Sequence, residues 1–168
     1  VFLENRADSS DYGFWLGYST GNTVQGNVIL GSRSVGIAIE HGATNRLLSN
    51  LVMGGKTGIL LFIRDSNGPA SRDYVVDGNT IGGVTRGLVL RRTAHVRVRG
   101  NIFDGVDEGL VADSTGRDAQ VTGNVFLRAQ QYFIVAPSLM AGSNYWATAT
   151  EAEALARVKG AIVLQPWF

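Results

Sequence analysis

The sequence predicts an all-β solenoid, wound in coils of about 22 residues and closed at its C-terminal end by a short helix and a strand. The first observation is a recurring asparagine. The second is a glycine about eight positions after each asparagine, followed by apolar residues. The third is that apolar residues recur at every second position, without the 3.6-residue period of a helix. The asparagines are Asn5, Asn27, Asn50, Asn79, Asn101 and Asn124, separated by 22, 23, 29, 22 and 23 residues. A fixed period in this range is typical of solenoids.

Each of the first five asparagines is followed by a glycine-apolar segment. Its first and third residues after the glycine are apolar, as a strand with one buried face requires. The segments are Gly13-Phe14-Trp15-Leu16, Gly36-Ile37-Ala38-Ile39, Gly58-Ile59-Leu60-Leu61, Gly87-Leu88-Val89-Leu90 and Gly109-Leu110-Val111-Ala112.

Two further apolar columns appear when the repeats are aligned on the asparagine. The third residue before it is Phe2, Val24, Leu47, Val76, Val98 or Val121, and the second after it is Ala7, Ile29, Val52, Ile81, Phe103 or Phe126. We expect these residues inside a tube whose coils pair in parallel about 4.8 Å apart. The asparagine side chain tolerates a left-handed turn and can hydrogen-bond to its equivalent in the next coil.

Two segments depart from the repeat. Residues 64–72 account for the 29-residue interval and are polar with glycine and proline, so they predict a loop, either a surface insertion or a wall of a binding groove. The repeat then decays after Gln131. A helix is predicted from Thr148 to Lys159, with Thr150 and Glu153 as a capping box and Gly160 at its end. A last strand is predicted over 161–164. Because the repeat decays, we divide the chain into coils (1–135) and a capping segment (136–168).

Composition excludes several functional classes. The 168 residues suit one domain, and the net charge of +1 provides no overall field to attract nucleic acid. Cysteine is absent, which removes disulfides, thiolate metal sites and cysteine nucleophiles. No apolar run is long enough for a membrane span or an export signal. Because the chain begins within a repeat strand, we expect it to be part of a longer protein.

Residues 24–29, 98–103 and 121–126, with the sequences VQGNVI, VRGNIF and VTGNVF, resemble right-handed parallel β-helix repeat proteins of the pectate-lyase-like group. The resemblance covers roughly residues 1–135. It implies a secreted, periplasmic or cell-surface protein that binds or processes an extended, anionic polysaccharide. An enzyme of this kind would be a polysaccharide lyase, a glycoside hydrolase or an epimerase. The alternative is a noncatalytic structural or interaction module within a longer protein or an oligomer.

A first candidate site lies on the outward positions four and two before the asparagine. These columns contain Arg46 and Arg97, and then Asp77 and Arg99. Arginine forks suit the carboxylates or sulfates of an anionic sugar, so Asp77, Arg97 and Arg99 are candidate catalytic residues and Arg46 a substrate contact. Ion pairs on an exposed sheet explain the same residues.

A second candidate site follows the glycine segments. Glu40 and His41 are expected two coils, about 10 Å, from Arg91 and Arg92. The carboxylate, the imidazole and Arg91 could act as base, acid and anion clamp, with Arg92 as a further substrate contact. Ordinary corner charges at turns are the alternative.

No cofactor is predicted. His41 and His95 are 54 residues apart, and the only thioethers belong to Met53 and Met140, so a copper site like that expected of periplasmic copper-associated β-helix proteins is not predicted. Calcium held by carboxylates such as Asp104, Asp107 and Glu108 is conceivable. That segment lacks the EF-hand pattern, however, and a turn is favoured.

An apolar outward column is the last feature. An apolar stripe on an outer face indicates contact with another chain, with a missing N-terminal part or with sugar rings. Trp15 and Tyr18 are candidate stacking residues for a pyranose face. The column consists of Trp15, Ala38, Leu60, Val89 and Val111.

Overall fold

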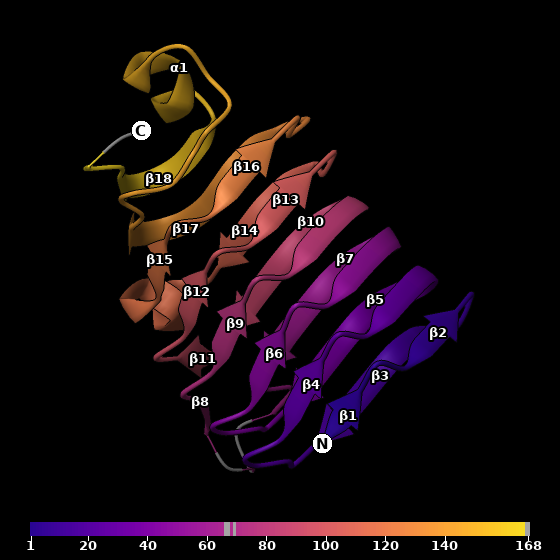
Figure 1. The fold of residues 1–168 in the computed structure, drawn as a ribbon. Helices are drawn as coiled ribbons and strands as arrows, with labels where there is room; N and C mark the ends of the chain where they lie inside the picture. The colour runs from indigo at the N-terminus through magenta and orange to yellow at the C-terminus, as the bar shows by residue number, and fades with distance from the viewer. Residues whose placement is uncertain (66–67, 69, 167–168) are drawn as a thin grey trace.

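The chain winds into a right-handed parallel β-helix of about seven turns, as the sequence predicts (Figure 1). The computed structural model describes residues 1–65, 68 and 70–166. Successive coils stack along one axis, with the N-terminus on the first coil and α1 at the opposite end (Figure 1). No helix in these residues is long and apolar enough to cross a membrane.

The first face of the tube is a ladder of strands of two or three residues. Val24 pairs with Leu47, and Val76 pairs with Val98 one turn later, which confirms the predicted register of the interior column. The residues on either side of this column point outward. The strands are β1 (Phe2–Leu3), β4 (Thr23–Gln25), β6 (Arg46–Leu48), β9 (Val75–Asp77), β12 (Arg97–Arg99) and β15 (Gln120–Thr122).

The second and third faces are joined by long strands that bend around a corner. These are β5 (Val28–Glu40), β7 (Leu51–Phe62) and β10 (Thr80–Arg91). In the other coils the strand is broken at the corner into β2 (Arg6–Asp8) and β3 (Tyr12–Gly17), β13 (Ile102–Asp104) and β14 (Glu108–Ala112), and β16 (Val125–Leu127) and β17 (Tyr132–Met140). Between the third and first faces lie β8 (Ser71–Arg72), β11 (Thr93–Ala94) and the 3-10 helix η1 (Ser114–Asp118).

The repeated asparagines form a continuous ladder inside the first corner. The Asn79 side chain accepts hydrogen bonds from the backbone N–H and the side-chain amide of Asn50, each at 2.9 Å, and donates to Asn101 Oδ1 at 2.9 Å. Asn144 adds a seventh member beyond Asn124. One expectation was wrong in detail. The left-handed conformation is adopted by the residue before each asparagine, such as Gly78 (φ 65°), and not by the asparagine itself.

The recurring glycine of each apolar segment is explained by the close approach of neighbouring coils. A Cβ on Gly58 would lie 2.7 Å from the carbonyl oxygen of Gly87 and 2.5 Å from Ile81 Cγ2. Gly36 and Gly109 would clash in the same way, at 2.7 Å and 2.5 Å from the carbonyl oxygen of the next coil. The repeat therefore keeps glycine for the packing of backbone on backbone.

Replacing Gly58 by alanine is expected to lower the free energy of unfolding by about 2 kcal/mol, because the new methyl group forces two coils apart. Urea unfolding followed by circular dichroism measures this change. Gly17→Ala is the matched control, since the nearest atom to its Cβ position is 3.9 Å away. An alanine there is expected to be neutral or slightly stabilising. Equal losses in the two variants would contradict this account.

The C-terminal segment covers the end of the core. Trp146 is fully buried and stacks on Phe126 at 4.9 Å, and Phe126 stacks on Phe103 at 4.9 Å. The predicted capping box is confirmed, with Thr150 as the N-cap of α1 (Glu151–Leu155).

The predicted helix is too long at its C-terminal end. Residues from Val158 form β18 (Val158–Val163), which pairs with β17 in the sheet. Gly160 therefore does not end a helix. It lies in this strand with φ 116°, where a Cβ would be 1.7 Å from the Ala136 carbonyl oxygen.

Candidate functional site

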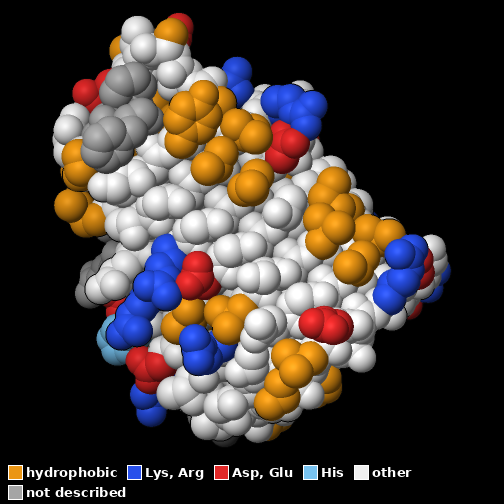
Figure 2. Space-filling model, in the orientation of Figure 1, with side chains coloured by type: hydrophobic (Ala, Val, Ile, Leu, Met, Phe, Trp, Pro, Cys, Tyr) orange, Lys and Arg blue, Asp and Glu red, His pale blue; other side chains and the backbone are white. Residues whose placement is uncertain are grey.

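A polar cleft of about 610 Å³ lies on the outer surface of the first face, where it meets the neighbouring corner. Its floor follows one outward column, in which Arg46 pairs with Val75, Val75 with Arg97 and Arg97 with Gln120. Neighbouring strands are about 4.8 Å apart, so the two arginines are separated by about 10 Å, with the half-buried Val75 between them. We call this the arginine cleft. Basic and acidic side chains gather in this part of the surface in Figure 2.

Neither arginine of the cleft is neutralised. Arg46 and Arg97 are exposed, and they form no ion pair within the described residues. The β6, β9 and β12 backbones fix their positions because these strands are locked in register by the interior column. An unpaired guanidinium with five donors is suited to a carboxylate, sulfate or phosphate of a ligand.

The rim of the cleft is an imidazole between two carboxylates. His95 Nδ1 lies 3.4 Å from Asp73 Oδ1, and His95 Nε2 lies 3.2 Å from Asp118 Oδ2. Asp73 also contacts Arg72. Asp73 and His95 adopt left-handed conformations, with φ of 61° and 53°, which turn the chain from the corner strands into β9 and β12.

A buried hydroxyl network lies beneath the floor beside the rim. Tyr74 is 1% exposed, and its hydroxyl lies 3.0 Å from Ser71 Oγ, which in turn accepts from Thr93 at 3.1 Å. Burial raises the pKa of Tyr74 above its ordinary value. This buried hydroxyl network fixes the corner from which the rim residues project.

The structure divides the first predicted site. Asp77 and Arg99 form an ion pair with 2.8 Å between Asp77 Oδ2 and Arg99 Nε, as expected for two charges that solvate a sheet. Arg97 lies in the arginine cleft with Arg46, and neither belongs to that pair. A catalytic role for Asp77, Arg97 and Arg99 thus stays a prediction. Two of these residues, Asp77 and Arg99, are paired with each other.

The second predicted site is spread over two coils. The side chain of Glu40 lies 3.4 Å from Arg64, and Phe62 separates Glu40 from Arg91 in the register. His41 is 2% exposed and stacks on Tyr18 at 4.8 Å.

Two other contacts engage residues of this second predicted site. Gly68 covers the other side of the His41 ring, because a Cβ on Gly68 would lie 2.5 Å from it. The predicted loop 64–72 therefore reaches this corner, although residues 66, 67 and 69 lie outside the described part. Arg92 donates its backbone N–H to Asp113.

The predicted apolar stripe is buried at two of its five positions, and Trp15 at its start is 43% exposed. Its register is confirmed, since Trp15 pairs with Ala38 and Ala38 with Leu60. Ala38 and Val89 are 0% and 8% exposed, so they present no free surface, and Leu60 and Val111 are half-buried. Trp15 packs on Tyr12 at 4.4 Å and under the guanidinium of Arg64.

Two features were missed by the sequence reasoning. The rim residues Asp73, His95 and Asp118 follow one corner column, which is visible in the alignment two positions before the arginine column. The second is an outer surface on the second face that is apolar at the first and third positions after Asn27, Asn50 and Asn124 and at the first after Asn101, whereas the fourth coil has Thr80 and Gly82 there. Leu51, Met53 and Ile102 are 36%, 37% and 37% exposed there. We call it the second-face patch, and it consists of Val28, Leu30, Leu51, Met53, Ile102, Val125 and Leu127.

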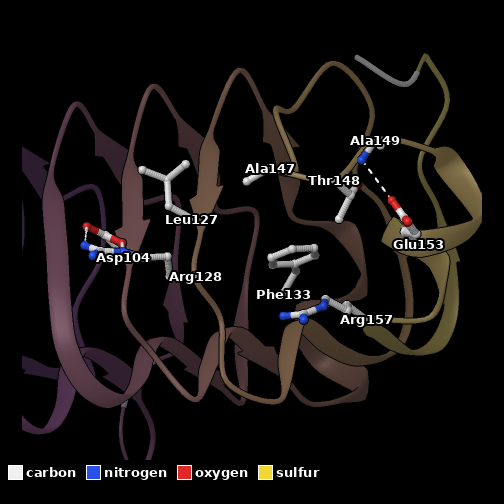
Figure 3. A pocket seen from close by; sticks show the side chains of 9 residues that line it. All are labelled: Asp104, Leu127, Arg128, Phe133, Ala147, Thr148, Ala149, Glu153 and Arg157. Carbon is white, nitrogen blue, oxygen red and sulfur yellow. Dashed lines mark hydrogen bonds and ion pairs between the residues drawn. The ribbon is translucent and has the colours of Figure 1, made fainter.

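A second cleft, of about 670 Å³, separates the last coils from α1 (Figure 3). Its charged groups are engaged within the protein. Asp104 binds Arg128, which lowers the pKa of Asp104 by its hydrogen bond. Glu153 caps α1, and Arg157 lies over the Phe133 ring and donates to Ala129 at 2.5 Å. This cleft offers a ligand fewer unpaired charges than the arginine cleft.

Comparison with known proteins identifies the family. Residues 1–159 match the family model NosD, described as "Periplasmic copper-binding protein (NosD)". The chain therefore belongs to the NosD family. The periplasmic description agrees with the location that the β-helix resemblance implies. No curated protein and no solved structure matches the chain.

The residues of this chain do not fit a copper site. No group of three or more His, Cys, Asp or Glu residues lies together in the part of the chain that the structure describes. The two nitrogens of His95 face different carboxylates, and His41 is enclosed by Tyr18 and Gly68. Met53 is on the second face, whereas Met140 pairs with Gln120 on the first. Copper sites need such donors to converge.

Proposed function

We propose that this member of the NosD family binds an extended anionic polysaccharide along the solenoid axis, in the arginine cleft. The observation that carries the proposal is the pair of exposed, unpaired arginines, Arg46 and Arg97, in one column of one cleft. Each guanidinium can bind a carboxylate or sulfate through two parallel hydrogen bonds. A polymer laid across the coils would reach both arginines, because both are on the floor of the same cleft.

The geometry supports binding more than catalysis. A general acid or base must lie within hydrogen-bond reach of the reacting group and be free to exchange its proton. Asp77 is paired with Arg99, and Glu40 with Arg64. The rim carboxylates Asp73 and Asp118 both contact His95, so they are suited to fixing the edge of the cleft.

The proposal is tested by titrating the protein with oligosaccharides in a calorimeter, with uronate-containing, sulfated and neutral chains of equal length. Binding of anionic chains that weakens as salt is added, together with no binding of neutral chains, is the expected result. Release of new reducing ends or of unsaturated sugars would instead favour an enzyme. Absence of binding to every anionic chain would refute the proposal.

A second candidate function is self-association through the second-face patch. Seven apolar residues lie in its two columns, on either side of Thr80 and Gly82 in the fourth coil, and exposed apolar patches mark interaction surfaces. Charged residues stand at both ends, with Arg6 and Asp8 in the first coil and Asp104 and Arg128 near the last. A two-fold axis along the strand direction would place the first coil opposite the sixth. The ion pairs at both ends are formed within the chain, so they leave no unpaired charge to oppose the contact of the apolar columns with their copies.

Leu51→Asp is expected to abolish this dimer, because it buries an unpaired carboxylate at the centre of the interface. Sedimentation velocity over a range of protein concentrations measures the effect. Gln25→Asp, on the exposed first face, is the control and should leave the sedimentation unchanged. A wild-type protein that remains monomeric at every concentration would rule this candidate out.

A further inference from the structure

The two outward columns of the arginine cleft carry charges that change from coil to coil. On the floor, the third, fourth and fifth coils carry Arg46, Val75 and Arg97. On the rim, the fourth coil carries Asp73 beside Val75. On the floor, the fourth coil therefore offers an apolar side chain where its two neighbours offer a guanidinium, and on the rim its Asp73 lies between Thr44 and His95 of those neighbours.

This order matters because a polymer along the axis meets one coil after another. A 1,4-linked pyranose advances a chain by roughly the distance between neighbouring strands, about 4.8 Å. Sugars bound over Arg46 and Arg97 are then separated by one sugar that lies over Val75. An anionic group on that middle sugar would lie over Val75, where it loses water and gains no guanidinium, and such an unpaired charge is a means of rejecting the wrong partner.

We infer that the arginine cleft selects polysaccharides whose anionic groups occur on every second sugar, and discriminates against chains charged on every sugar. This inference rests on the proposed function, since it names the ligand class of the same cleft. Val75 is half-buried and apolar, so it suits the apolar face of a neutral sugar in the middle position. Asp73 is paired on the rim with His95 and Arg72, so the middle position offers an anionic sugar no free cation.

The inferred binding preference is the opposite of the preference that simple charge attraction would give. At equal length, a chain charged on every sugar carries twice the charge of an alternating chain, so nonspecific attraction favours the fully charged chain. Tighter binding of the alternating chain would therefore reflect the order of residues in the cleft and not the overall charge of the ligand.

The test compares two oligosaccharides of equal length at physiological salt by calorimetric titration. One alternates glucuronate with N-acetylglucosamine, and the other contains only galacturonate. We expect the alternating chain to bind wild-type protein about tenfold more tightly, a modest difference in binding free energy. In Val75→Arg, which places arginine on three consecutive coils, the galacturonate chain should bind at least as tightly as the alternating one. Asp8→Asn, at a surface ion pair outside the cleft, is the control and should change neither affinity.

Each outcome has a definite meaning. Equal or tighter binding of the galacturonate chain by wild-type protein would overturn the inference and leave the proposed function intact. An affinity ratio that does not change in Val75→Arg would do the same. If neither chain binds, the proposed function itself fails.

Discussion

Replacing Asn79 by alanine is expected to lower the free energy of unfolding by about 4 kcal/mol, because several buried hydrogen-bonding groups lose their partner at once. The Asn79 side chain accepts two hydrogen bonds from Asn50 and donates to Asn101 and to the Leu47 carbonyl, all at 2.9 Å. Asn79 is 0% exposed, so water does not replace it. Urea unfolding followed by circular dichroism measures the change.

The same substitution at Asn5 is the matched control. Asn5 is exposed on the first coil, and its side chain makes a single hydrogen bond, to Asn27 Oδ1 at 3.0 Å. Asn5→Ala should therefore cost no more than about 1 kcal/mol. Similar losses for the two variants would show that the ladder does not stabilise the stacked coils.

Replacing both Arg46 and Arg97 by glutamine is expected to weaken the binding of an anionic oligosaccharide about a hundredfold. Hydrogen bonds between charged groups contribute roughly 1.5 to 3 kcal/mol each, and the double variant removes at least two of them. Each single variant should give part of the loss. Because the side chains are exposed on the outer surface, the unfolding transition of the double variant should match that of the wild type.

Arg86→Gln is the matched control for charge. Arg86 is also exposed on a strand, but it lies in the second half of β10 and outside the arginine cleft. The net charge changes by one unit in each single variant, so a nonspecific attraction would decrease equally in all of them. An affinity that falls as far in Arg86→Gln as in Arg46→Gln would contradict a site in the cleft.

The fold was predictable because its determinants are local and repeated. Each of Val24, Leu47 and Val76 occupies an equivalent place in its coil, so the asparagine spacing alone sets their register. The failures came where the repeat ends. The capping box at Thr150 and Glu153 marks the start of α1 correctly. Its end depends on the pairing of β18 with β17, which no local pattern near Lys159 reveals.

The candidate site was only partly predictable for a related reason. Register placed Arg46 and Arg97 in one column, and this is confirmed. Which charges remain unpaired depends on side-chain direction, since Asp77 binds Arg99 and not Arg97. Likewise, Arg64, from the long loop, lies over Trp15, which is 43% exposed, whereas Ala38 and Val89 of the same stripe are buried. Such contacts join residues that are distant in the sequence and differ between coils.

The most direct test of the proposed function is a crystal structure of the protein with an oligosaccharide that alternates glucuronate and N-acetylglucosamine. We expect the saccharide to run along the solenoid axis, with two glucuronate carboxylates on Arg46 and Arg97 and the intervening sugar over Val75. A saccharide bound in the cleft beside α1, on the second-face patch, or across the first face without contact to either arginine would contradict the account.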